Sequence, residues 1–373
     1  MDGYTIRKKF KKIIYGSLLG LMCAPSALLA RPAVSVSAQT RPVVIVDDLP
    51  DPWNRFREFL LTGTEETVTI ADVCSYTKTG SNLSIKLKRN VSATRDDRST
   101  MLVIPAGFTV EIDLCDKNIF QYNQLSTPCD NAGIFDVYGH LTIKDSVGQG
   151  DINGGDCECG GMFKIHSDAS VFVNGGYLWG NYARDKGGFA YVYPNASITI
   201  VGGDIEGNHA PYGGEIYLEG ENSIAIINGG QIYNGDQSIE GGVVKVCKGA
   251  RLEIDGGRLT DHKAKFGGGI YNAGEVIIKG GYIAGNRALE VTDGDVTDGG
   301  LGGGIYSCGT QENPASILMT GGQITDNIAT TFGSGIANDS YSSVSFSNLA
   351  KVTGNNRQDV DGKLSKDNVT ILD

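Results

Sequence analysis

Apolar residues recur along the chain at a fixed interval that is marked by pairs of adjacent glycines. The first kind of doublet opens at Gly175, Gly202, Gly229, Gly256, Gly280 and Gly321, in steps of 27, 27, 27, 24 and 41 residues. A second kind opens at Gly187, Gly213, Gly241, Gly267 and Gly302, in steps of 26, 28, 26 and 35 residues. Two interleaved series with one period define a structural repeat of about 27 residues.

Apolar residues alternate with mostly polar ones on both sides of each first doublet, which is the periodicity of β-strands. Three residues after its first glycine stand Leu178, Ile205, Ile232, Leu259, Ile283 and Ile324. No helical pattern separates the strands, so an alternating βαβ sheet is excluded. Short strands at a fixed period can bury their apolar side only by stacking coil on coil. The pattern therefore predicts an all-β fold, a right-handed parallel β-helix.

Asparagine recurs at the same interval, six residues after the first glycine of the doublet. It stands at Asn181, Asn208, Asn286 and Asn327, whereas Asn234 comes one place early and His262 takes the position in another repeat. Asparagine tolerates left-handed backbone and hydrogen-bonds the turns above and below it. We interpret these residues as a structural ladder along the solenoid.

The first 38 residues have the three parts of a secretory signal peptide. Five basic residues within 7–12 precede the apolar stretch 13–22, which is too short to span a bilayer, and 36–38 offer small residues for cleavage. We therefore expect an exported protein, secreted or at the cell surface, with no transmembrane span after cleavage. An uncleaved anchor and lipidation at Cys23 are the alternative interpretations of this segment.

The rest of the chain divides into two parts by the regularity of its repeat. We expect 39–133 to hold an N-terminal cap and irregular first coils, with a short amphipathic helix at 50–62 as the cap. Residues 134–373 are expected to form the regular β-helix coils.

Removal of the leader makes the chain more acidic. It takes away six of the 32 basic and one of the 43 acidic residues, which leaves 26 and 42 and a net charge of −16. Nucleic acid and anionic membrane surfaces are poor partners for such a body.

Seven cysteines remain after residue 38, an odd number that cannot all pair within one chain. Cys157 and Cys159 are separated by one residue, which is too close for the usual zinc spacing, so we expect no metal there. In a strand both would point the same way, as loop or stacking residues or paired with a cysteine of an adjacent coil. Cys115 and Cys129 are spaced to close a short loop.

The repeats resemble those of secreted bacterial right-handed parallel β-helix surface proteins. The segments GGGIYN at 267–272 and GGYIAGNRA at 280–288 carry the resemblance, and they are also similar to the glycine and asparagine repeats of the chlamydial polymorphic membrane proteins. The resemblance covers roughly residues 50–373. It implies surface display with adhesion or glycan contact. Wall-sorting signals, which some such proteins carry, have no counterpart in the printed sequence.

Outward positions flank the apolar residue that follows each first doublet, and they should line one continuous face. Four of them are aromatic, Tyr177, Trp179, Tyr233 and Tyr282, and carboxylates and amides lie among them. Such a row suits sugar rings, through stacking and hydrogen bonds, so we expect an extracellular glycan or a surface protein as partner. The alternative is that the rings only pack on one another.

A second outward series follows the second kind of doublet, which opens at Gly187, Gly213, Gly241, Gly267 and Gly302. We interpret this series as structural. Its members are Tyr191, Tyr217, Lys245, Tyr271 and Tyr306.

An enzyme is the second functional hypothesis, by analogy with polysaccharide lyases and glycoside hydrolases that share this fold. Asp204 and Glu206 are the best catalytic pair. Residues i and i+2 of a strand project to the same side about 7 Å apart, which is within the range of an inverting hydrolase. No clustered basic residue accompanies a carboxylate set as a calcium-dependent lyase requires.

The step of 41 residues departs from the period and places about 14 extra residues between Ala288 and Gly302. Long loops on a rigid scaffold often carry function. Three aspartates, Asp293, Asp295 and Asp298, make calcium the one cofactor hypothesis, although the spacing and terminal glutamate of an EF-hand are missing. A solvated acidic loop is the alternative.

Overall fold

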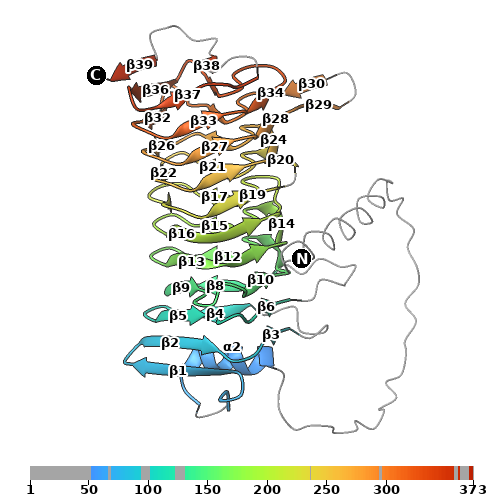
Figure 1. The fold of residues 1–373 in the computed structure, drawn as a ribbon, viewed down its shortest axis with the longest axis vertical. Helices are drawn as coiled ribbons and strands as arrows, with labels where there is room; N and C mark the ends of the chain where they lie inside the picture. The colour runs from blue at the N-terminus through green and yellow to red at the C-terminus, as the bar shows by residue number, and fades with distance from the viewer. Residues whose placement is uncertain are drawn as a thin grey trace, which may run out of the picture. The chain divides into compact units, whose positions relative to one another are not determined.

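The repeat folds as a stack of coils. A computed structural model describes residues 52–65, 69–93, 101–121, 131–235, 237–293, 296–356, 360–361 and 369–372, so the predicted signal peptide lies outside the described residues. Residues Leu49–Asp373 form one unit, in which short parallel strands stack as a β-solenoid of about nine turns (Figure 1). The predicted all-β, parallel β-helix architecture with coils of about 27 residues is confirmed.

The largest sheet, with 20 strands among the described residues, supplies two strand positions to each coil. The first position is held by β2 (Asn82–Leu87), β5 (Thr109–Asp113), β9 (His140–Lys144), β18 (Ile224–Ile227), β22 (Arg251–Ile254), β26 (Glu275–Ile278), β32 (Ala315–Met319), β36 (Ser342–Ser347) and β39 (Val369–Leu372). The second is held by β3 (Val91–Ser92), β6 (Ile119–Phe120), β10 (Asp151–Asn153), β19 (Gln231–Tyr233), β23 (Arg258–Thr260), β27 (Tyr282–Ala284), β33 (Gln323–Thr325) and β37 (Lys351–Val352). The long strands β13 (Ser170–Trp179) and β16 (Ser197–Glu206) run through both positions, and β1 (Cys74–Thr79) pairs antiparallel with β2.

Two further sides complete each coil. One is a sheet of β4 (Leu102–Ile104), β8 (Phe135–Val137), β12 (Phe163–Ile165), β15 (Ala190–Val192), β17 (Ile216–Leu218), β21 (Val244–Val246), β25 (Ile270–Asn272), β31 (Ile305–Ser307), β35 (Ile336–Asn338) and β38 (Val360–Asp361). The other side holds β7 (Asn131–Ala132), β11 (Asp156–Cys159) and β14 (Tyr182–Lys186), then β20 (Gln237–Glu240), β24 (Lys263–Phe266), β28 (Arg287–Ala288) and β34 (Ile328–Ala329). Before residue 134, parallel pairing joins β2 to β5, and β4 pairs in parallel with β8. The division of the chain at residue 134 into irregular and regular coils stays a prediction.

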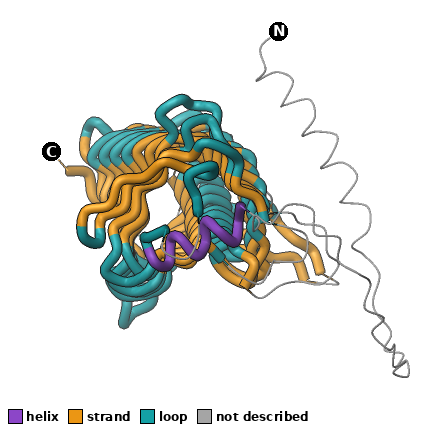
Figure 2. Tube along the Cα trace, turned by 90° about the horizontal axis from the view of Figure 1, so that it is seen from below, coloured by secondary structure: helices purple, strands orange, loops and turns teal. Residues whose placement is uncertain are grey.

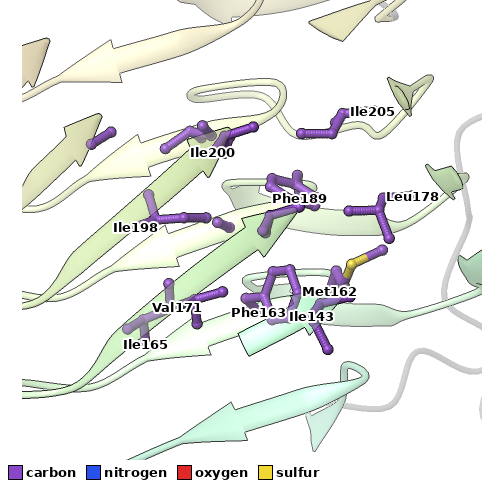
Figure 3. Packing of buried hydrophobic residues seen from close by; sticks show 14 of the residues in the cluster. Ile143, Met162, Phe163, Ile165, Val171, Leu178, Phe189, Ile198, Ile200 and Ile205 are labelled. Atoms are coloured by element: carbon purple, nitrogen blue, oxygen red, sulfur yellow. The ribbon is translucent and has the colours of Figure 1, made fainter. Parts of the chain in front are cut away.

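The core is a set of apolar columns because the strands pair in register. Leu178 lies opposite Ile205, which lies opposite Ile232, and all three side chains are fully buried. Aromatic rings meet in the core near β8, β12 and β15, where the centroid of Phe163 lies 5.5 Å from Phe135 and 5.3 Å from Phe189. Figure 3 shows Phe163 and Phe189 packed among aliphatic side chains. The apolar positions that defined the repeat are therefore the interior of the solenoid.

The second kind of glycine doublet lies at a bend of each coil, and its two glycines serve different purposes. Gly187 has a φ of +62°, a left-handed conformation that side chains disfavour. Gly188 lies against the next coil, where a Cβ would stand 2.4 Å from the backbone nitrogen of His209. One glycine therefore sets the turn and the other allows close stacking.

The predicted asparagine ladder is confirmed on the inside of the turn after the second strand position. The side-chain oxygen of Asn208 accepts from the backbone N–H of Asn181 at 3.0 Å, and Asn327 and Asn286 repeat this bond at 3.0 Å. Asn234 has a φ of +57° and occupies the left-handed position before the ladder, which leaves Gly235 in the ladder position. Asn355 extends the ladder by one coil.

The N-terminal end of the stack is covered by helix α2 (Pro52–Thr62), close to the predicted 50–62 (Figure 2). Trp53, Phe56 and Phe59 are fully buried on its inner face. Arg55, 3% exposed, donates to Asp72 at 2.7 Å and to the Thr69 carbonyl at 2.9 Å. The described part of the chain contains no helix long and apolar enough to cross a bilayer.

The prediction that all the extra residues lie between Ala288 and Gly302 is wrong. The step from Gly280 to Gly302 is 22 residues instead of 11 or 12, and the step from Gly302 to Gly321 is 19 instead of 13 to 16. The first insertion forms an antiparallel hairpin of β29 (Glu290–Asp293) and β30 (Val296–Gly299). The second lengthens the turn between β31 and β32. The 41-residue step from Gly280 to Gly321 contains both insertions, so this one spacing does not show that there are two.

Candidate functional site

The outward residues at the second strand position of successive coils form one continuous surface, as the sequence predicted. We call this surface the doublet face, and it consists of two columns of side chains. One column is Tyr177, Asp204, Gln231, Arg258, Tyr282 and Gln323. The other is Trp179, Glu206, Tyr233, Thr260, Ala284 and Thr325. Successive members lie on adjacent strands, about 4.8 Å apart along the axis.

Two aromatic rings stand together on β13 at the N-terminal end of the doublet face. Tyr177 and Trp179 stack with their centroids 5.8 Å apart and an angle of 23° between their planes. Both side chains are half-buried, and the Tyr177 hydroxyl donates to the carboxylate of Glu206 on the next coil. The two rings therefore form one apolar surface, with the hydrogen-bonded Tyr177 hydroxyl at its edge.

The two carboxylates on β16 are held by neutral donors. Gln231 donates its side-chain N–H to Asp204 at 3.3 Å, and Asn234 donates to Glu206 at 3.1 Å. Ile205 between them points into the core, which keeps both acids on the outside of the solenoid. Carboxylates oriented in this way accept hydrogen bonds from hydroxyl groups.

The remaining aromatic residues of the doublet face lie further along the solenoid. Tyr233 follows Glu206 in the second column and is half-buried. Tyr282 is 39% exposed, and the guanidinium carbon of Arg258 stands 5.1 Å from its ring centroid. The structure thus brings Tyr177, Trp179 and the two acids together, while Tyr282 belongs to a separate cluster.

Asn234 was assigned to the ladder by sequence reasoning, which missed its contact with Glu206. Its position one residue before the ladder was the available signal, because it places the side chain on the outward turn instead of the interior.

The calcium hypothesis at Asp293, Asp295 and Asp298 stays a prediction. The side chains of Asp293 and Asp295 lie outside the described residues, and Asp298 pairs with Lys265 at 2.9 Å. The described residues contain no group of three or more His, Cys, Asp or Glu side chains arranged to hold a metal ion.

Cys157 and Cys159 lie in an irregular strand and differ in burial, whereas the prediction assumed a regular strand. The register shifts between them in β11, so Cys157 is buried while Cys159 is only half-buried. Burial raises the pKa of the Cys157 thiol to about 12, which keeps it protonated. All six cysteines that the structure describes are free thiols, and Cys129, the expected partner of Cys115, lies outside the described residues.

Comparisons of the chain with models of known protein families, with curated proteins and with solved structures return no match.

Proposed function

We propose that this protein is an exported, non-catalytic β-helix of the secreted bacterial surface-protein type, with an adhesin-like role, and that it binds glycans on the doublet face. The observation that carries the proposal is the stacked pair Tyr177 and Trp179 beside two amide-held carboxylates. A sugar ring stacks on an aromatic face through its C–H groups, and its hydroxyls donate to nearby carboxylates. The basic and apolar leader at 1–38 supports export.

The shape of the face favours a chain-like glycan over a single sugar. The two columns run parallel to the axis with a rise of about 4.8 Å per coil, close to the length of one sugar unit. Gln231 and Tyr233 continue the polar and aromatic character for a further coil beyond Asp204 and Glu206. The binding energies of several weak contacts along one polymer then add, so that no deep pocket is needed.

A glycan array probed with residues 39–373 tests the proposal, followed by titration of the best glycan. The variant Trp179→Ala should weaken binding at least tenfold because it removes the stacking ring. Phe172→Ala is the matched control, since Phe172 lies on the same strand, is 38% exposed and stands outside the doublet face. Equal loss in both variants, or no glycan bound by the wild-type protein, would contradict the proposal.

The second candidate function is a polysaccharide lyase or glycoside hydrolase acting on the same face. Its support is that Asp204 and Glu206 flank one inward residue on a single strand and project outward together. Incubation of the bound glycan with the protein, followed by mass spectrometry of the products, distinguishes the two functions. Shorter products that disappear with Asp204→Asn and Glu206→Gln would establish catalysis, and an intact glycan supports the binding role.

A further inference from the structure

A second line of aromatic residues follows the bend made by the later glycine doublets. We call it the aromatic corner. One side is the outward row of the ten-stranded sheet, Tyr191, Tyr217, Lys245, Tyr271 and Tyr306. The other side is the row that precedes the doublets, Lys186, Tyr212, Glu240, Phe266, Leu301 and Phe332.

The aromatic corner holds lysine side chains of this chain against aromatic rings. The ammonium of Lys245 lies 4.6 Å from the ring centroid of Tyr212 and 5.4 Å from that of Tyr271, and it pairs with Glu240. Lys265 stands 5.3 Å from the centroid of Phe266 and 2.9 Å from the carboxylate of Asp298. An aromatic face and a carboxylate together are a favourable environment for an ammonium group.

Beyond Lys265 the same corner opens into a pocket of about 420 Å³. Its walls include the apolar and aromatic side chains of Leu301, Tyr306 and Phe332, of which Phe332 is 45% exposed. Its acidic members are Glu290 and Asp339, together with Asp298. No lysine or arginine is among the described residues that line it.

The inserted hairpin builds one wall of this pocket. Glu290 begins β29, where its backbone N–H donates to the Thr330 hydroxyl at 2.9 Å and its carboxylate accepts from Thr331 at 2.6 Å. Asp298 on β30 is joined to the neighbouring coil through Lys265. The departure from the 27-residue period therefore has a structural result, a walled pocket at one end of the aromatic corner.

The charge of the pocket favours a cation. Lys265 compensates one of the three carboxylates, which leaves a formal charge of two negatives on the described lining. Asp339 accepts from the Ser342 hydroxyl at 2.7 Å, a neutral donor that fixes the carboxylate without cancelling its charge. Burial, with Cys308 and Asp339 nearby, raises the pKa of Tyr306 above its ordinary range, so the phenol stays neutral.

We propose that this pocket binds the side chain of a lysine presented by a partner protein. The four-carbon stem lies along Leu301 and Phe332, and the ammonium reaches the Tyr306 ring between Glu290 and Asp339. Lysine is favoured over arginine because the cations that this chain itself places in the corner, Lys186, Lys245 and Lys265, are all lysines. The proposal is independent of glycan binding on the doublet face.

The test titrates residues 39–373 with the peptide acetyl-Gly-Lys-Gly-Lys-Gly-amide and follows backbone amide signals by NMR. We expect shifts centred on Phe332 and Tyr306, and none with the same peptide acetylated on both lysine side chains. Glu290→Gln and Phe332→Ala should each weaken binding at least fivefold. Glu58→Gln is the matched control, because it removes one exposed carboxylate on α2.

Three outcomes would overturn the proposal. Equal affinity for the acetylated peptide would show that the charge is not recognised. Equal weakening by Glu290→Gln and Glu58→Gln would show only a general attraction to an acidic protein. Glucosamine that binds as tightly as the peptide would assign the pocket to amino sugars. Trp179→Ala should leave peptide binding unchanged, which separates this result from that of the glycan experiment.

Discussion

At the scale of single residues, one position interrupts the asparagine ladder, and a buried glutamate and histidine fill the space. Gly235 has no side chain to continue the ladder between Asn208 and His262. Glu215 and His262 are both fully buried, with Oε1 and Nε2 3.4 Å apart, and Asn208 donates to the other carboxylate oxygen at 2.7 Å. A carboxylate and an imidazole two coils apart thus replace one asparagine.

Restoring a side chain at this break should destabilise the protein. A Cβ on residue 235 would stand 2.2 Å from the ring of His262, so Gly235→Ala forces the buried pair to shift. We expect a loss of about 1–3 kcal/mol, the usual cost of overpacking a core, in urea unfolding followed by circular dichroism. Gly202→Ala is the control, because its nearest contact is an ordinary 3.4 Å and its φ is not left-handed. Equal losses in both variants would mean that the break has no special geometry.

At the scale of elements, a repeating element could be predicted from the sequence and an exceptional one could not. The inward isoleucines and the ladder asparagines recur at the same position of successive repeats, so the interpretation of one residue is supported by the equivalent residues of the other repeats. Glu215 occurs once, at the position that Phe189 holds one coil earlier, and its buried side chain contacts His262 two coils later. The two insertions likewise have no second copy in the chain to fix their ends.

The same contrast applies to the candidate site. Alternation along a strand decides which side a residue faces, and so the composition of the doublet face was predictable. Side-chain pairs across coils, such as Asn234 with Glu206, depend on turn conformation, which the spacing alone does not determine.

The ion pair between Arg55 of helix α2 and Asp72 should make the free energy of unfolding depend on pH, with stability lost at acid pH. Hydrogen bonds from Arg55 hold the pKa of Asp72 below its ordinary value. A carboxyl whose pKa is lowered by folding stabilises the protein above its unfolded pKa, about 3.9, and this is lost as the pH falls through the folded value. Asp72→Asn should therefore lower the free energy of unfolding at pH 6 and have a smaller effect at pH 3. Because Asp72 is 41% exposed, we expect the pH-dependent part to stay below about 1 kcal/mol.

Urea unfolding at both pH values measures this effect. The control is the same substitution in an Arg55→Met background, where the pH-dependent difference should vanish because the donor is gone. A difference that persists in that background would assign the pH dependence to another partner of Asp72, such as Arg89 at 3.4 Å.

Shortening the hairpin should separate its role in the pocket from its role in the fold. Val291 on β29 is 38% exposed, and no residue of β29 or β30 belongs to the buried apolar core among the described residues. Replacing 290–299 with a two-residue Asn-Gly turn should therefore shift the melting temperature by less than about 4 °C, the effect of a change under 1 kcal/mol. It should also abolish binding of the lysine peptide. A protein that no longer melts cooperatively would show that the hairpin closes the core.

At the scale of the whole molecule, each coil contacts mainly the coils before and after it, so the solenoid behaves as a one-dimensional array. Its chemistry is distributed in the same way. The aromatic pair of the doublet face lies on β13, whereas the acidic pocket lies beyond β24, so the two proposed sites use different coils and are expected to act independently.

Removal of one complete coil tests both the array and the separation of the sites. Residues 170–196 are 27 residues that begin and end at equivalent positions, because Ser170 pairs with Ser197 and both preceding alanines are buried. After their deletion β9, which pairs with β13 through His140 and Ser170, can pair with β16 in the same register. We expect an unchanged β-sheet circular dichroism spectrum and cooperative melting, with glycan binding lost and lysine binding kept. Deletion of 170–183 alone shifts the register by half a coil and should abolish folding, since it turns apolar side chains outward. If both deletions folded equally well, stacking in register would not be what holds the coils together.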